Sequence, residues 1–232
     1  MRLYLPAILL LATLVGSLPA FAQSDADLEQ VLTRMDKAKD SFRTTQATFV
    51  WDQFTSVVND TDTQKGKVYY RRNGNETQMA VDVTDPYPKY VLIADGKLQL
   101  FEPKVDRVTV YDLQKNQDTF ESFLTLGFGG GGHAMQKNFT VKYLGTEKVA
   151  GIDTVKLDLV PKNPKVLNMF AHIVLWVDPA RSVAIQQQLF QQGGDYRLAK
   201  YSDIQMNQKI ADSAFKLKTG GKTTFENVSP HN

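Results

Sequence analysis

Cysteine is missing from this chain of 232 residues, and histidine occurs only three times. Without cysteine there is no disulfide, no thiol nucleophile and no thiolate metal site. A chain of this length can bury a hydrophobic core that is stable without disulfides. The histidines, His133, His172 and His231, lie far apart in the sequence. We therefore expect neither a metal site nor a cofactor.

Neither sign of charge predominates. The chain carries 27 Lys and Arg against 25 Asp and Glu, a formal net charge of +2. Proteins that bind nucleic acids concentrate basic residues on one face, because the phosphate backbone supplies most of the affinity. The balanced composition therefore argues against a nucleic acid as partner.

Long apolar runs are also scarce, and the one clear case lies at the N-terminus. Arg2 is followed by the apolar run Leu3–Leu18 and then by Ala20-Phe21-Ala22. A basic start, a short apolar stretch and small residues two apart are typical of a secretory signal peptide. The run is too short for a membrane-spanning helix. We predict that residues 1–22 are a signal peptide and that residues 23–232 form the exported protein.

The usual catalytic motifs are absent. The sequence has no nucleophile elbow, P-loop, zinc-protease motif or dinucleotide fingerprint. Its carboxylates are scattered and fall mostly at expected turns, where Asp favours the turn itself. We expect no enzyme. An enzyme acting on lipid or glycan, using Asp82, Asp95 or neighbouring residues, remains an alternative hypothesis.

Alternation of polar and apolar residues dominates the sequence and predicts a mainly β protein of α+β class. Two-residue turn signals, Asn73-Gly74 and Asp95-Gly96, join neighbouring runs, which favours antiparallel pairing. Asn59–Lys65 has the composition of a polar turn, and Thr219–Asn232 that of a loose tail. We expect about ten or eleven strands. The candidate ranges are 47–54, 66–72, 77–83, 90–94, 97–102, 107–111, 139–144, 154–160, 172–177, 183–190 and 197–203.

One substantial helix is predicted, over Ser24–Phe42, where apolar residues recur at helical spacing. Its single apolar stripe indicates packing against one surface, such as the sheet. No linker or internal repeat divides the chain. We therefore expect a single domain over residues 23–232.

A segment of different character lies at Asp118–His133. Its apolar residues recur at roughly helical spacing, and glycines interrupt and follow them at Gly127 and Gly129–Gly132. Glycine-rich backbone is costly to order. We interpret this segment as a short helical lid on a floppy tether, covering the apolar face of a curved sheet. The expected lid residues are Phe120, Phe123, Leu124, Leu126 and Phe128.

The strands are rich in aromatic residues, and this has two interpretations. They form either the filled core of a sandwich or the lining of a cavity for an apolar ligand. We favour the cavity, because one helix is too little to cover the inner face of so large a sheet. A filled core, and with it a scaffold or envelope sensor that carries nothing, remains the alternative. The expected lining residues are Phe49, Trp51, Met79, Val81, Phe101, Trp176 and Phe190.

Arg71 and Arg72 form a basic pair at the end of a predicted strand. Successive strand residues point to opposite faces, so one of the two should point inward. An inward guanidinium at the cavity mouth could donate hydrogen bonds to lid carbonyls and hold the lid closed. We therefore expect Arg71 or Arg72 to act as a lid latch.

Taken in order, several motifs resemble the LolA-like family, the bacterial outer-membrane lipoprotein-sorting proteins. These motifs are F-x-W at 49–51, G-K-V-Y-Y-R-R at 66–72, the block at 94–110, L-x-L-G-F-G-G-G-G at 124–132, L-x-L-V-P-K at 157–162 and I-V-L-W-V-D at 173–178. The resemblance implies an unclosed antiparallel β-barrel with an N-terminal helix and a helical lid over a hydrophobic cavity. It also maps the family's latching arginine onto Arg71 or Arg72.

The same resemblance implies a function. The family's best-known members carry lipoproteins through the periplasm and shield their acyl chains. They receive cargo from an inner-membrane ABC-type releasing complex and deliver it to an outer-membrane receptor. By this resemblance, the chain is expected to be a periplasmic monomer that binds acylated lipoprotein or a related lipid.

Overall fold

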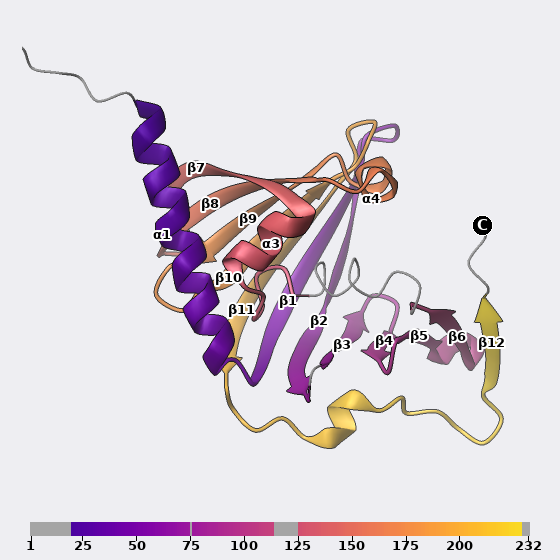
Figure 1. Cartoon of the computed structure of the whole chain (residues 1–232). Coiled ribbons are helices and arrows are strands. Elements are labelled where there is room, and N and C mark those ends of the chain that lie inside the picture. The colour runs from indigo at the N-terminus through magenta and orange to yellow at the C-terminus, as the bar shows by residue number, and fades with distance from the viewer. Residues whose placement is uncertain (1–19, 75, 114–124, 229–232) are drawn as a thin grey trace, which may run out of the picture.

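The computed structural model describes residues 20–74, 76–113 and 125–228. Twelve strands form one sheet in the order β12-β6-β5-β4-β3-β2-β1-β11-β10-β9-β8-β7. Neighbouring strands are antiparallel except β12, which runs parallel to β6. The sheet curves and its two edges do not meet (Figure 1). The expectation of a mainly β, unclosed antiparallel sheet is therefore confirmed.

The strands follow the predicted alternation closely. Their bounds are β1 Thr44–Thr55, β2 Asp60–Asn73, β3 Glu76–Asp85, β4 Lys89–Ala94, β5 Lys97–Glu102, β6 Arg107–Asp112, β7 Phe139–Val149, β8 Ile152–Pro161, β9 His172–Asp178, β10 Val183–Phe190, β11 Tyr196–Met206 and β12 Thr224–Val228. Asp95 and Gly96 both have positive φ, 54° and 68°, as a tight two-residue hairpin turn requires.

Two segments expected to be irregular are strands. Residues 60–65 belong to β2, and the β1–β2 turn is confined to residues 56–59. This part of β2 is polar on both faces, so it shows no alternation, but its backbone pairs with β1. Thr224–Val228, expected in a loose tail, is β12. Its side chains are mostly exposed, so a core-facing pattern could not reveal it.

Helices cover part of one face of the sheet, here called the inner face (Figure 1). The long helix α1 spans Ala20–Ser41, and the short helix α3 spans Gly132–Asn138. Their apolar residues Leu32, Met35 and Met135 pack with Leu157 and Leu175 of β8 and β9 in a buried core. A third helix, α4, spans Pro164–Met169 and is capped by the side chain of Asn163. None of the described helices combines the length and apolar character needed to cross a membrane.

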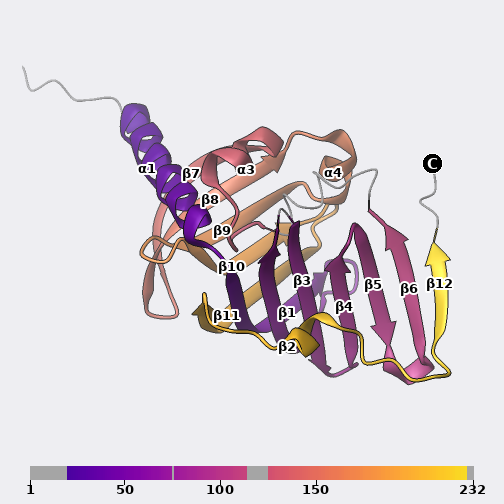
Figure 2. The same ribbon diagram turned by 60° about the horizontal axis from the view of Figure 1, so that its bottom comes forward.

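The C-terminal segment crosses the other face, here called the outer face (Figure 2). A 3-10 turn at Asp212–Phe215 places Phe215 against Ala80 and Leu92 of β3 and β4. Another 3-10 turn, Pro103–Val105, joins β5 to β6. The C-terminal segment then reaches the edge of the sheet as β12. Each face is therefore covered in part, by different parts of the chain.

Candidate ligand-binding site

An apolar cavity of about 370 Å³ lies on the inner face, beside the part of the sheet that α1 and α3 cover. Its volume falls in the range of small-molecule sites. Six strands, the helix α4 and the loop before α3 form its walls. The lining residues are Phe49, Trp51, Val68, Tyr70, Met79, Val81, Ile93, Leu126, Val166, Met169, Phe170, Gln187, Leu189, Ala199 and Tyr201.

Strand alternation and register bring these side chains to one face. Val68 pairs with Val81 across β2 and β3, and Tyr70 pairs with Met79. Residues directly opposite in an antiparallel pair share a face. The structure therefore places four of the expected lining residues in the cavity wall: Phe49, Trp51, Met79 and Val81.

The other three expected lining residues do not line this cavity. Trp176 and Phe190 belong to an outer-face cluster with Val174 and Ile185. Trp176 donates its indole N–H to Glu147 Oε2 at 3.0 Å, and Phe190 stacks on His172. Since successive strand residues alternate between faces, Leu189 rather than Phe190 points into the cavity.

Phe101 is also on the outer face. It pairs with Tyr90, whose side chain packs in the cluster around Phe215. The residues of β4 that alternate with Tyr90, such as Ile93, line the cavity instead. Sequence alternation defined the two faces of these strands but did not show which one the helices cover.

Phe128 is fully buried between two tyrosines. Its ring stacks on Tyr70 with centroids 4.8 Å apart, and it meets Tyr201 edge-on at 4.8 Å. Burial raises the pKa of both tyrosines. The Tyr201 hydroxyl donates to Gln187 Oε1 at 3.1 Å, and Gln187 Nε2 donates to the Leu126 carbonyl. These contacts fasten the loop at 125–131 to the cavity wall.

The glycines of this loop, and Gly132 at the start of α3, are packed rather than floppy. A Cβ on Gly129 would lie 2.5 Å from the Phe42 ring, and one on Gly132 would lie 2.7 Å from the Leu32 carbonyl carbon. Gly127 has a φ of +79°, and its carbonyl accepts from Ala184 N at 2.8 Å. The expectation of a loose tether is therefore wrong for these residues, because glycine is needed here for close backbone approach.

Two of the expected lid residues, Leu126 and Phe128, are buried in the structure. The other three, Phe120, Phe123 and Leu124, lie outside the described residues. The lid therefore remains a prediction over most of its length.

Arg71 and Arg72 point to opposite faces. Arg72 lies on the inner face, where its Nη1 donates to the Lys39 carbonyl at 3.2 Å and its guanidinium lies over the Phe42 ring. Arg71 lies on the outer face and donates to Gln78 and Asp212, both at 2.7 Å. Arg72 thus contacts the end of α1, whereas Arg71 holds the C-terminal segment.

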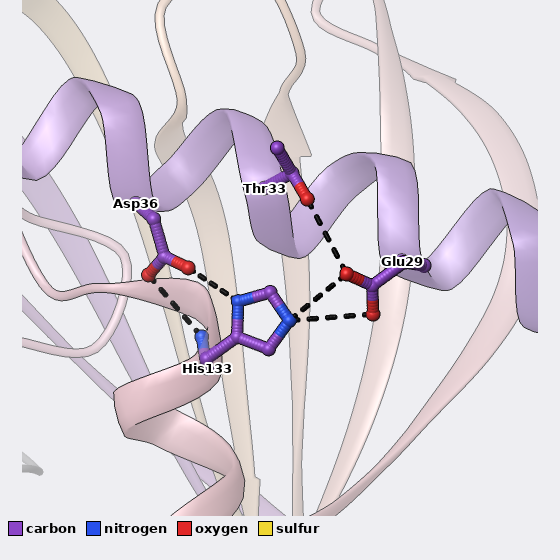
Figure 3. Close-up of polar contacts among 4 residues, drawn as sticks. All are labelled: Glu29, Thr33, Asp36 and His133. Carbon is purple, nitrogen blue, oxygen red and sulfur yellow. Dashed lines mark hydrogen bonds and ion pairs between the residues drawn. The ribbon is translucent and has the colours of Figure 1, made fainter.

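His133 joins α3 to α1 (Figure 3). Its Nδ1 contacts Asp36 Oδ2, its Nε2 lies 3.0 Å from Glu29 Oε1, and its backbone N–H donates to Asp36 Oδ1 at 3.3 Å. The hydrogen bond to Asp36 is the main reason that the pKa of His133 is raised, with Glu29 adding to it. Sequence spacing gave one hint of this contact, because Glu29 and Asp36 lie two turns apart on one helix face.

Among the described residues, the cavity wall contains no group of side chains typical of a catalytic or metal site. Within the described ranges, no group of three or more His, Cys, Asp and Glu side chains could hold a metal ion. Asp82 pairs with Lys67 and Tyr90 on the outer face, and Asp95 lies in the β4–β5 turn. Neither carboxylate lines the cavity.

Solved structures of similar fold place this arrangement among known proteins. An uncharacterized conserved protein from Thermus thermophilus matches with a TM-score of 0.56 and 10% identity, over 87% of this chain and 99% of that one. MucB matches with a TM-score of 0.53 and 15% identity, over 85% of this chain and 64% of MucB. A LolA superfamily protein from Nitrosomonas europaea matches with a TM-score of 0.41 and 14% identity, over 82% of this chain and 97% of that one.

Identities this low show a shared fold and nothing finer. The chain spans about 64% of the length of MucB. A search of curated proteins finds no match. A family model described as an uncharacterized protein matches residues 89–228, which is more than half of the chain. The resemblance expected from the sequence is confirmed at the level of the fold. The chain therefore belongs to this family of uncharacterized proteins, and it shares its fold with MucB and the Thermus thermophilus protein.

Proposed function

We propose that this protein binds the acyl chains of lipoproteins, or of a related lipid, and carries them through the periplasm toward the outer membrane. The observation that carries this proposal is the cavity of about 370 Å³, whose lining is almost entirely aliphatic and aromatic. Gln187 and the two tyrosine hydroxyls are the main polar groups in its wall. An acyl chain is the ligand class that needs such a lining.

A carrier is needed because acyl chains are costly to expose to water. Burying one CH2 group is worth roughly 0.8 kcal/mol, so a whole chain cannot cross an aqueous space unshielded. The carrier must also release its cargo, which requires empty and loaded states of similar free energy. Movement of the loop that carries Phe128 away from Tyr70 and Tyr201 would enlarge the cavity. This loop is our candidate for the element that responds to cargo.

Location and partners rest on the sequence. The signal peptide predicted at 1–22 supports export of a single domain over 23–232. The LolA-like resemblance supports an inner-membrane ABC-type releasing complex as donor and an outer-membrane receptor as acceptor. We propose that the protein is a monomer. We also propose that it has no catalytic activity, since Asp82 and Asp95 lie away from the cavity.

Binding of a fluorescent fatty acid tests the proposal. We expect saturable binding by the purified protein, reduced by Ala199→Phe and by Val81→Phe, which fill the cavity from two different walls. Leu144→Phe is the control, because Leu144 is an exposed residue of β7 outside the cavity. Circular dichroism establishes that each variant is folded. Absence of binding by the folded wild-type protein would refute the proposal.

A lipid-sensing or scaffold protein is the second candidate. It is favoured by the likeness to MucB, which has been solved in complex with MucA, again at a level that shows only a shared fold. The two candidates differ in release of the ligand. A carrier transfers bound lipid to acceptor vesicles or to a second lipid-binding protein, whereas a sensor retains it. A transfer assay with the loaded protein separates them.

A further inference from the structure

A second cavity, of about 510 Å³, adjoins the apolar one. It lies between the last turn of α1, the β2–β3 hairpin, the glycine loop and α3. Leu126 lines both cavities, so the two share this residue in their walls. A ligand longer than the apolar cavity could therefore extend from one into the other.

The second cavity differs from the first in its charge. Lys39 of α1, Arg72 of β2 and Lys137 of α3 line it. None of its described lining residues is Asp or Glu. Within the described part of the chain, these three cations form no ion pair. Three elements thus bring positive charge to one cavity, and its described lining contains no carboxylate.

The donors of Arg72 are only partly used. Its Nη1 donates to the Lys39 carbonyl, which fixes the guanidinium at the cavity. A guanidinium has five N–H donors in a planar fork, so most of them stay available for an incoming acceptor. Guanidinium and ammonium groups together suit a phosphate, because it carries negative charge and several acceptor oxygens.

We propose that the cargo is an anionic amphiphile: its acyl chain occupies the apolar cavity and its phosphate-bearing headgroup lies among Lys39, Arg72 and Lys137. This assignment rests on the proposed function, since it takes the apolar cavity as the site of the chain. It adds the class of headgroup and the three residues that select it. A neutral lipid with the same chains fits only the apolar half of the site.

The experiment compares two lipids that differ only in the phosphate. Fluorescent phosphatidic acid and diacylglycerol with identical chains are titrated into the full exported chain at low salt. We expect phosphatidic acid to bind about tenfold more tightly or better, since hydrogen bonds between charged groups are the stronger class. Added salt should reduce this preference, because both lysines are exposed and their charges are screened.

Substitutions test which residues cause the preference for phosphatidic acid. Lys39→Gln with Lys137→Gln removes two charges from exposed positions and should weaken phosphatidic acid binding about threefold to tenfold, with diacylglycerol binding unchanged. Arg72→Gln should act in the same direction. Lys67→Gln is the control, because Lys67 is exposed on β2 at a position that faces away from Arg72. The double lysine variant keeps the test valid if Arg72→Gln fails to fold.

Each outcome has a defined meaning. Equal affinity for the two lipids, or unchanged preference in the double lysine variant, overturns the assignment while leaving the acyl-chain carrier intact. Glycerol 3-phosphate binding as tightly as phosphatidic acid shows a site for a soluble phosphate and also overturns it. Binding of neither lipid refutes the proposed function itself.

Discussion

Phe128 stacks on Tyr70 with the two ring planes only 13° apart. One ring comes from the loop before α3 and the other from the C-terminal part of β2, so this contact joins the loop to the cavity wall. Tyr70 is itself a lining residue of the cavity. Stability of the loop and access to the cavity are therefore linked through one aromatic pair.

The first prediction concerns this pair. Phe128→Ala should lower the free energy of unfolding by about 3 kcal/mol, because truncating a fully buried Phe leaves a cavity. It should also speed association of a fluorescent fatty acid, since the loop loses its main anchor. Urea denaturation and stopped-flow binding measure the two effects. Phe225→Ala is the control, as Phe225 is 58% exposed on β12, and an equal loss of stability there would contradict the prediction.

A second prediction separates the two arginines. Arg71→Ala should free the C-terminal segment, since it removes the hydrogen bonds to Asp212 and Gln78 and the contact of the guanidinium with the Phe215 ring. Hydrogen exchange should rise at residues 207–217 and stay unchanged in α1. Arg72→Ala should have the opposite pattern, with faster exchange in the last turn of α1, where Lys39 accepts its hydrogen bond. Identical hydrogen-exchange maps for the two variants would contradict the prediction that the two arginines stabilise different segments.

The third prediction tests why glycine occupies the first position of α3, directly after the loop. Gly132→Ala should destabilise the protein by about 1 to 3 kcal/mol, because the added methyl group meets the backbone of Leu32 and overpacks the α1–α3 contact. Gly221→Ala is a matched control, since a Cβ there meets open space. Thermal unfolding of the two variants provides the comparison. A floppy tether would tolerate both changes equally.

A pH dependence follows from His133. Its pKa is raised in the folded protein, chiefly by the hydrogen bond to Asp36. A raised folded pKa means that the folded state holds the proton more tightly than the unfolded chain does. This contribution to stability is therefore fully present below the unfolded value of about 6.5 and is lost as pH rises through the folded pKa.

His133→Gln should remove that contribution and flatten the stability profile in this window. Chemical denaturation at a series of pH values between 5 and about 8 measures it. Asp36→Asn should flatten the profile as well, because it removes the partner that causes most of the shift. If the plot of stability against pH keeps its slope in both variants, groups other than His133 cause the pH dependence.

Much of the fold could be predicted because alternation is a local property. A strand with one buried face must repeat every two residues, and β1, β3 and β8 show this pattern in the sequence and in their burial. The Asp95-Gly96 turn was also predictable from local sequence, since Asp and Gly are residue types that adopt the positive φ angles of this turn. β12 was not, because exposed side chains on a parallel edge strand leave no periodic signal.

The candidate site was predictable only in part. Alternation grouped Phe49 with Trp51, but it could not show that Trp176 and Phe190 lie on the other face of the sheet. The glycine run was visible, yet its role was not, since close packing against Phe42 and Leu32 depends on residues far away in the chain.

By itself, the sequence determined the strand-rich class, the long amphipathic helix, the tight turns and the LolA-like resemblance, because these depend on neighbouring residues and on motif order. Only the tertiary structure decided which face α1 covers, which of Arg71 and Arg72 points inward, and that an apolar and a cationic cavity meet at Leu126. These relationships join residues far apart in the chain, and the curvature of the sheet and the placement of α1 on it bring them together.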